Sequence, residues 1–262
     1  MDKMPQICYF HGLPGSANEL ALFGDAKQNA FSEFFVPSRD GSCPDGNIHS
    51  YLDAIAIQIA ERFPHGSIRL IGFSLGAFLA LQIAERLENR VEKIDLISAA
   101  APLSLGDFLD DMAGKAVFQT ARTSTTLFSV LVKIQSWAAR WMPSLLVKAV
   151  FANAAGQDLQ LANNSAFQNS MAMIIGQSLG QNANTYRREI EFYVTDWSAT
   201  LPKVTQPITL WQGEMDNWTP PAMADALQKA LPNVVARHYL KGLSHYSTLR
   251  HFLKNVDSSP AS

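Results

Sequence analysis

The segment Gly72-Phe73-Ser74-Leu75-Gly76 lies between an apolar run, residues 67–71, and a stretch with helical spacing of apolar residues, 77–87. Glycines on both sides of a serine remove the side chains that would clash where a buried strand turns sharply into a helix. The pattern therefore predicts that the Ser74 hydroxyl is exposed above a strand as a nucleophile. It also directs the Leu75 amide toward the oxygen of a substrate carbonyl.

Apolar runs typical of strands alternate with helical patterns along the rest of the chain. This alternation favours an α/β fold with a mostly parallel sheet covered by helices on both faces. The expected strands are 6–10, 34–37, 68–73, 93–98, 208–211 and 235–240. The expected helices are 18–30, 48–63, 74–87, 221–231 and a closing helix through Leu253.

Between residues 102 and 201 the strand-like runs stop, and apolar residues recur at helical spacing. We therefore expect a helical cap at 102–201, inserted into a core made of 1–101 and 202–256. Residues 257–262 are expected to form a frayed tail.

Composition narrows the functional class. The 262 residues are 47% hydrophobic and only 17% charged, which suits one α/β domain with an insertion and some additional apolar surface, such as a pocket. The net charge of -2 and the absence of a basic run argue against a nucleic-acid partner. Charged residues and a proline interrupt the most apolar long stretch, 125–152, so no integral membrane association is expected.

The two cysteines, Cys8 and Cys43, are too few for a disulfide framework. No signal peptide precedes the first expected strand. Both features favour a cytoplasmic protein. No nicotinamide, flavin or metal motif occurs in the sequence, so no cofactor and no metal are expected.

A nucleophilic serine needs a base, and His245 is the best candidate among six histidines. It lies just beyond the last expected strand, in a loop at the same carboxyl edge of the sheet as Ser74. His11 is interpreted as a residue that shapes its loop by bonding nearby backbone. The remaining histidines, which fall on a strand, a helix or surface turns, are expected to be structural or exposed: His49, His65, His238 and His251.

A carboxylate that fixes the tautomer of the histidine would complete the group. Asp216 fits because it follows the strand 208–211 in another loop at a carboxyl end. Glu214, two residues away, is the main competitor. Asp95 and Asp107, close to the strand 93–98, are weaker alternatives.

A second donor to the carbonyl oxygen is expected from the loop His11-Gly12-Leu13-Pro14-Gly15-Ser16, which follows the first strand. The glycines permit a tight turn, and Pro14 has no amide hydrogen. The Leu13 amide is therefore the natural partner of the Leu75 amide in an oxyanion hole.

Taken in order, the loop after the first strand, the segment around Ser74, residues 213–220 and residues 242–245 resemble the landmarks of the α/β-hydrolase superfamily, in its esterase-like and lipase-like members with a serine nucleophile. The resemblance covers nearly the whole chain outside the insertion. It implies a central, mostly parallel sheet with a helical cap, and a Ser74, Asp216 and His245 triad with the Leu13 and Leu75 amides as oxyanion hole. Only about five residues precede Gln6, so the sheet is expected to be shortened at its N-terminal side.

A serine at this turn favours acyl chemistry over dehalogenation, because related dehalogenases and epoxide hydrolases place an aspartate there. The leading hypothesis is a cofactor-independent serine hydrolase of small or medium apolar carboxylic esters, thioesters or lactones. An acyltransferase or a carbon-carbon bond hydrolase with the same triad is the alternative. A non-catalytic ligand-binding member of the fold is a third hypothesis.

The cap offers bulky apolar side chains for a substrate pocket. We expect Trp137, Trp141, Met171 and, beside Asp216, Trp218 to line it. Most residues in such a helical stripe pack the core instead. Trp and Met side chains on an exposed cap surface are also compatible with a homodimer.

Overall fold

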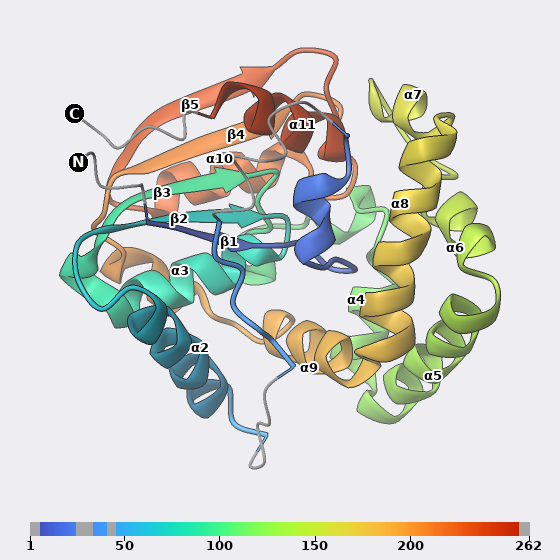
Figure 1. Ribbon diagram of the computed structural model, residues 1–262, viewed down its shortest axis with the longest axis horizontal. Coiled ribbons are helices and arrows are strands. Elements are labelled where there is room, and N and C mark those ends of the chain that lie inside the picture. Colours follow the sequence, from blue (N-terminus) through green and yellow to red (C-terminus); the bar gives the residue numbers. More distant parts are fainter. Residues whose placement is uncertain (1–5, 25–33, 41–45, 257–262) are drawn as a thin grey trace.

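The computed structural model describes residues 6–24, 34–40 and 46–256. Its centre is a sheet of five parallel strands whose order in space is their order along the chain (Figure 1). The strands are β1 (Ile7–Phe10), β2 (Ile68–Phe73), β3 (Val91–Ile97), β4 (Ile208–Gly213) and β5 (Val234–Leu240). The predicted α/β class with a parallel central sheet is confirmed.

Helices α2 (Ile48–Arg62) and α3 (Gly76–Leu87) lie along one side of the sheet (Figure 1). Helices α10 (Pro221–Ala230) and α11 (His245–Asn255) both pack against β4. Because these layers cover the sheet, β1 is buried along its whole length and β2 at all but one position, whereas the edge strand β5 is half-exposed. This explains why the sequence of β2 does not alternate and is apolar at every position except Arg69.

Every element described between β3 and β4 is helical. The α-helices are α4 (Lys115–Thr123), α5 (Thr125–Trp141), α6 (Pro143–Val150), α7 (Asp158–Ala162), α8 (Ser165–Ile175) and α9 (Ala183–Tyr193). A π-helical segment, η5 (Gly176–Gln181), joins α8 to α9, and three short 3-10 segments are η3 (Leu103–Leu105), η4 (Leu109–Asp111) and η6 (Ser198–Lys203). The assignment of 102–201 as a separate cap stays a prediction.

These helices gather at the end of the sheet toward which the strand arrows point (Figure 1). Local signals set their limits. The Ser124 side chain accepts a hydrogen bond from the Leu127 amide and starts α5, and Pro143 occupies the first turn of α6, where its missing amide hydrogen costs nothing. No helix in the described ranges is long and apolar enough to span a bilayer.

Two expected elements of the N-terminal part differ in the structure. In place of the helix 18–30, the chain forms a 3-10 turn, η1 (Ala17–Ala21), capped by the Ser16 side chain and followed by Gly24 in a left-handed conformation; residues 25–33 lie outside the described ranges. The expected strand 34–37 is reduced to a single parallel bridge between Phe35 and Cys8. The expected tail, 257–262, also lies outside the described ranges.

The turn from β2 into α3 depends on close contacts at its two glycines. A Cβ on Gly72 would lie 2.7 Å from the Ala77 Cα, and a Cβ on Gly76 would lie 2.1 Å from the carbonyl oxygen of Phe10. Both neighbours are backbone atoms, so they cannot rotate away. The helix begins at Gly76 rather than at Ser74, because Ser74 has a φ of 56° and cannot join an α-helix.

Glu19 is a buried carboxyl beneath the loop that follows β1. Its Oε2 accepts hydrogen bonds from the Tyr9 hydroxyl at 2.9 Å and from the Gly12 amide at 3.1 Å. Burial raises the pKa of Glu19 to about 7, although these hydrogen bonds and the charge of Arg39 lower it. The Glu19 carboxyl therefore links β1 to the loop that follows it. Because the group is buried, its ionisation is unfavourable.

We expect Gly76→Ala to lower the free energy of unfolding by at least about 2 kcal/mol, because the new methyl group forces α3 away from β1. Thermal or urea unfolding measures the loss. Gly176→Ala is the matched control, since the nearest atom to its new Cβ is 3.9 Å away and the residue has a helical φ of -59°. Equal stability of the two variants would contradict the close contact.

The raised pKa of Glu19 predicts a pH-dependent stability. Below pH 4.5 the carboxyl is protonated in both the folded and the unfolded state, and above its folded pKa of about 7 it is ionised in both. Stability therefore falls as pH rises through this window, by up to about 3 kcal/mol. Glu19→Gln should remove that contribution.

Urea unfolding at a series of pH values measures the effect. Glu19→Gln and wild type should be similarly stable near pH 4.5, and the variant should be the more stable above pH 7. Glu61→Gln, at an exposed position in α2, should leave the wild-type pH profile intact. A constant difference between Glu19→Gln and wild type across the pH range would refute the assignment.

Candidate active site

Ser74 lies at the sharp turn between β2 and α3, with its backbone held from β3. Its amide donates to the Ile97 carbonyl at 3.0 Å, and its own carbonyl accepts from the Ala100 amide at 3.1 Å. Its φ of 56° is in the left-handed region, which is unfavourable for a serine. Strain of this kind persists where the surrounding structure imposes it, and it is concentrated at functional sites.

Leu13 and Leu75 border the same cavity as Ser74. A Cβ on Gly12, next to Leu13, would lie 3.1 Å from the Ser74 Cβ, so the loop after β1 passes directly beside the serine. Among the residues that the structure describes, neither the Leu13 amide nor the Leu75 amide has a hydrogen-bond acceptor. Two unpaired donors beside a cavity-lining hydroxyl form an arrangement that could hold a carbonyl oxygen.

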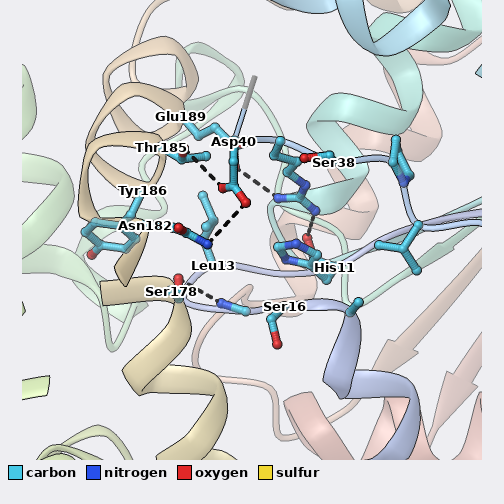
Figure 2. A pocket seen from close by; sticks show the side chains of 15 residues that line it. His11, Leu13, Ser16, Ser38, Asp40, Ser178, Asn182, Thr185, Tyr186 and Glu189 are labelled. Carbon is cyan, nitrogen blue, oxygen red and sulfur yellow. Dashed lines mark hydrogen bonds and ion pairs between the residues drawn. The ribbon is translucent and has the colours of Figure 1, made fainter. Parts of the chain in front are cut away.

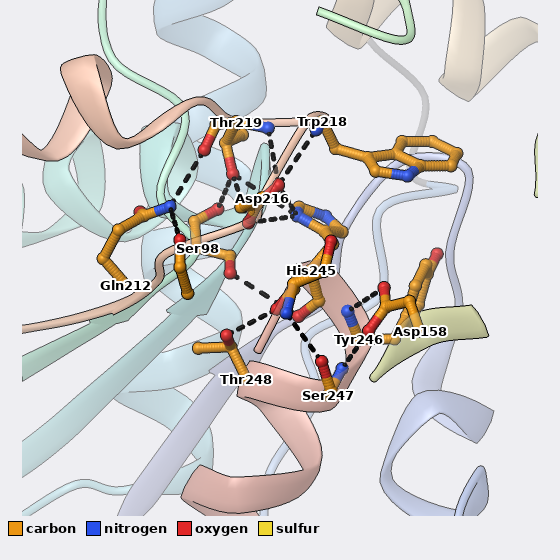
Figure 3. Close-up of polar contacts among 12 residues, drawn as sticks. Ser98, Asp158, Gln212, Asp216, Trp218, Thr219, His245, Tyr246, Ser247 and Thr248 are labelled. Atoms are coloured by element: carbon orange, nitrogen blue, oxygen red, sulfur yellow. Dashed lines mark hydrogen bonds and ion pairs between the residues drawn. The ribbon is translucent and has the colours of Figure 1, made fainter. Parts of the chain in front are cut away.

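His245 and Asp216 form a buried pair (Figure 3). The Nδ1 of His245 lies 2.9 Å from Oδ2 and 3.2 Å from Oδ1 of Asp216, and both side chains are nearly inaccessible to solvent. Asp216 also accepts hydrogen bonds from the amides of Trp218 and Thr219 at 2.9 and 3.0 Å. These donors fix the carboxylate, and the carboxylate in turn fixes the orientation of the imidazole.

The pKa of Asp216 reflects two opposing effects. Burial alone would raise it, but the charge of His245 and the hydrogen bonds from His245, Thr219 and Ser98 together outweigh burial. The pKa of Asp216 therefore lies below its ordinary value, and the carboxylate stays ionised beside the imidazole.

Aromatic rings place the His245 imidazole close to the turn that carries Ser74. Its centroid is 4.7 Å from that of Phe73, the residue before the serine, and 5.5 Å from that of Trp218, on which it stacks. Among the described residues, the Ser74 hydroxyl makes no hydrogen bond to His245. In sites without substrate, hydrogen bonds of this kind are often long.

The competing carboxylates lie elsewhere. Glu214 accepts from the Gly242 amide at 3.1 Å, and Asp107 is exposed on a loop. Asp95 is paired with Arg69 at 2.7 Å and accepts from the indole nitrogen of Trp211. Of the four carboxylates considered from the sequence, the structure brings only Asp216 to His245.

His11 shapes its loop as expected. Its Nδ1 lies 2.9 Å from the carbonyl oxygen of Gly12. Burial and the neighbouring Arg39 charge hold the pKa of His11 well below its ordinary value, so the ring is neutral. The ring of His238 stacks on Trp211 at a centroid distance of 3.9 Å, which agrees with a structural role.

Two buried carboxyls at the site were missed by sequence reasoning. Asp158, in α7, accepts hydrogen bonds from the amides of Tyr246 and Ser247 at 2.9 and 2.7 Å. These two residues follow His245 in the first turn of α11 (Figure 3). No local signal marks it, because 88 residues separate it from Tyr246. Glu19 stands three residues after Ser16, a spacing typical of a helix start, but the sequence does not show that its side chain turns beneath the Leu13 loop.

The cavity beside Ser74 has a volume of about 270 Å³. Most of its lining is apolar, from side chains that include Val117, Phe118, Leu146, Val150 and Ile190. None of the residues that line it carries a charge. A site of this kind suits a small or medium apolar ligand.

Of the four side chains expected to line the pocket, only Trp218 borders this cavity. Trp137 and Trp141 face outward, 57% and 74% exposed, and border a separate hollow with Arg140. Met171 is fully buried in the core. Helical spacing alone does not show which residues of an apolar stripe face the cavity. This explains why three of the four expected residues do not line it. A homodimer through the exposed tryptophans stays a prediction.

No cluster of three or more His, Cys, Asp or Glu side chains suited to a metal ion occurs in the described ranges. Ser74 and two residues whose amides have no acceptor among the described residues, Leu13 and Leu75, border one cavity. The imidazole of the His245-Asp216 pair packs against Phe73, next to Ser74. Such a set can support nucleophilic attack on a carbonyl group.

Comparisons with known proteins agree with this fold. The bromoperoxidase from Bacillus anthracis matches 95% of this chain and 88% of its own, with a TM-score of 0.65 and 16% identity. A thermophilic esterase from Thermogutta terrifontis matches 97% of this chain and 90% of its own, with a TM-score of 0.63 and 15% identity. An esterase from Rhodococcus matches 97% and 92%, with a TM-score of 0.62 and 12% identity. At these identities the likeness concerns the fold.

A search of the curated proteins with this sequence found no match. The family model described as alpha/beta hydrolase fold matches residues 5–247. This range includes all five strands and every residue of the candidate site. The chain therefore belongs to the α/β-hydrolase fold family.

Proposed function

We propose that the protein is a cofactor-independent serine hydrolase that cleaves small or medium apolar carboxylic esters through an acyl-enzyme on Ser74. The buried pair of His245 and Asp216, beside a serine that shares its cavity with two unpaired amides, is the observation that carries the proposal. The family and its esterase-named structural neighbours support a hydrolase.

In the first step, the Ser74 Oγ attacks the ester carbonyl carbon while His245 Nε2 takes the hydroxyl proton. The carbonyl oxygen gains negative charge and accepts hydrogen bonds from the Leu13 and Leu75 amides. Asp216 stabilises the imidazolium through Nδ1. The tetrahedral intermediate then collapses, the carbon-oxygen bond to the alcohol breaks, and His245 returns the proton to the departing alcohol.

In the second step, water attacks the acyl-enzyme. His245 takes a proton from the water as the carbonyl oxygen again develops charge between the two amides. Collapse of this intermediate releases the carboxylic acid, and the proton on His245 returns to Ser74. The enzyme is then regenerated with no other reactant consumed.

The cavity supports an apolar substrate. It holds no charged side chain that would bind a carboxylate, a phosphate or an ammonium group, and its volume of about 270 Å³ limits the substrate to a modest size. Thioesters and lactones of similar size present the same carbonyl to Ser74.

We expect a fluorophosphonate to label wild type once, at Ser74, and not to label Ser74→Ala, as measured by intact mass. Ser74→Ala and His245→Ala should each lower kcat/KM on p-nitrophenyl esters by about three orders of magnitude or more. Asp216→Asn should lower kcat/KM somewhat less. Glu214→Gln is its matched control and should keep near-normal activity. Absence of labelling in folded wild type would refute the serine mechanism, and loss of activity in Glu214→Gln alone would reassign the acid.

Asp158 is proposed to position His245, because its carboxylate fixes the first turn of α11. Asp158→Asn replaces one acceptor oxygen with an amide that cannot accept from the Tyr246 or Ser247 amide. We expect kcat to fall about tenfold with little change in KM. Asp196→Asn is the control, because Asp196 also accepts from a backbone amide, that of Ser198 at 3.0 Å, at the start of η6.

Steady-state kinetics and thermal unfolding of both variants separate the two roles of Asp158. A lower melting temperature with an unchanged kcat at 25 °C would mean that Asp158 only stabilises the fold. A fall in kcat for Asp158→Asn but not for Asp196→Asn supports positioning of the imidazole.

A further inference from the structure

Two polar side chains, Gln135 and Tyr186, lie among the mostly apolar residues that line the cavity. Gln135 lies on α5 and Tyr186 on α9, and both border the cavity that contains Ser74. Most of the other lining residues, such as Ile190 of α9 and Val117 of α4, are apolar. A purely apolar substrate would need neither of these polar groups for binding.

The Oε1 atom of Gln135 is buried and has no hydrogen-bond partner among the residues that the structure describes. Among the described residues that line the cavity, it is the single buried side-chain oxygen or nitrogen in this condition. Buried acceptors in native proteins are almost always paired, because leaving one unpaired opposes folding. In this conformation Oε1 has almost no accessible surface, so a donor on a ligand in the cavity pairs with it after the Gln135 side chain rotates toward the cavity.

Tyr186 supplies a complementary group. Its ring is only 4% exposed, and its side chain interacts with that of Gln135. Burial raises the pKa of Tyr186 well above its ordinary value, so the phenol keeps its proton and can donate it. Tyr186 also borders a smaller polar cavity of about 150 Å³, where Figure 2 shows it near Asn182 and Leu13.

A hydroxyl group fits this pair because it can donate to Gln135 Oε1 and accept from the Tyr186 hydroxyl. A carboxylate or a fully ionised phosphate lacks a donor, and an ammonium group lacks an acceptor. Neither ion would find a counter-charge, since none of the residues lining the cavity is charged. The chemistry of the wall therefore selects a neutral hydroxyl on an otherwise apolar chain.

We propose that Gln135 and Tyr186 form a hydroxyl-binding subsite, and that the preferred substrate is an apolar ester that carries one hydroxyl on its chain. This inference rests on the proposed esterase function of Ser74. The hydroxyl can belong to the acyl part or to the alcohol part of the ester. Sites that hydrogen-bond a substrate hydroxyl discriminate strongly against the analogue that lacks it.

The test compares paired esters that differ only in one hydroxyl. One series varies the acyl chain, as ethyl hexanoate and its monohydroxylated derivatives, and a second series varies the alcohol, as hexyl acetate and its monohydroxylated derivatives. Acid release is followed by pH-stat. For at least one pair in one series, we expect wild type to show a kcat/KM at least tenfold higher for the hydroxylated ester. The series that shows this preference identifies the part of the ester that carries the hydroxyl.

Gln135→Met and Tyr186→Phe should each bring the ratio of the two kcat/KM values close to one. Tyr193→Phe is the matched control: Tyr193 is a buried tyrosine of the same helix, its hydroxyl donates to the Ala101 carbonyl at 2.8 Å, and it does not border the cavity. This variant should keep the wild-type ratio. Because the ratio compares two substrates on one protein, a loss of folded enzyme does not change it.

Three outcomes are distinguishable. A ratio near one for every pair in wild type that hydrolyses the plain esters would overturn the subsite and leave the esterase function intact. A high ratio that survives in both Gln135→Met and Tyr186→Phe would likewise overturn it. Folded wild type that neither reacts with fluorophosphonate nor hydrolyses any ester would refute the proposed function itself.

Discussion

The left-handed backbone of Ser74 is the constraint on which the candidate site depends. It is held by hydrogen bonds to Ile97, the last residue of β3, and to Ala100, just beyond that strand. The contact of Gly76 with the carbonyl of Phe10 holds it from the other side. Because these contacts come from strands on both sides of β2, the hydroxyl keeps its place only while the sheet is intact. The sheet therefore holds a strained conformation that a short peptide would not adopt.

Buried carboxyls then fix the groups around the serine. Asp216 orients His245 directly, and Asp158 holds the helix that begins at His245. Glu19 holds the loop of Gly12, next to the Leu13 amide. Each carboxyl accepts at least two hydrogen bonds, which is the condition under which burial of such a group is tolerated. The three are placed by different segments, so the site is assembled from distant parts of the chain.

The helices between β3 and β4 do more than cover the end of the sheet, because they also contribute side chains to the candidate site. Through Asp158 they hold the first turn of the helix that carries His245, and through Gln135 and Tyr186 they add polar groups to the lining of the apolar cavity. The side chains that look most suited to a pocket in the sequence, Trp137 and Trp141, face solvent instead. In our proposals, the strand-derived loops supply the chemistry and the helices supply the choice of substrate.

The sequence by itself determined the parallel sheet and the sharp turn at Ser74, because strand and helix periods and flanking glycines are local patterns. The sequence also narrowed the other candidate site residues to a few loops at strand ends, since parallel strands bring their carboxyl ends to one edge of the sheet. Tertiary structure alone decided that Asp216 rather than Glu214 meets the imidazole. It also decided that Asp158 and Glu19 turn inward and which face of α5 meets the cavity. These outcomes depend on the packing of segments far apart in the chain, which set the direction of each side chain, and no local pattern encodes that direction.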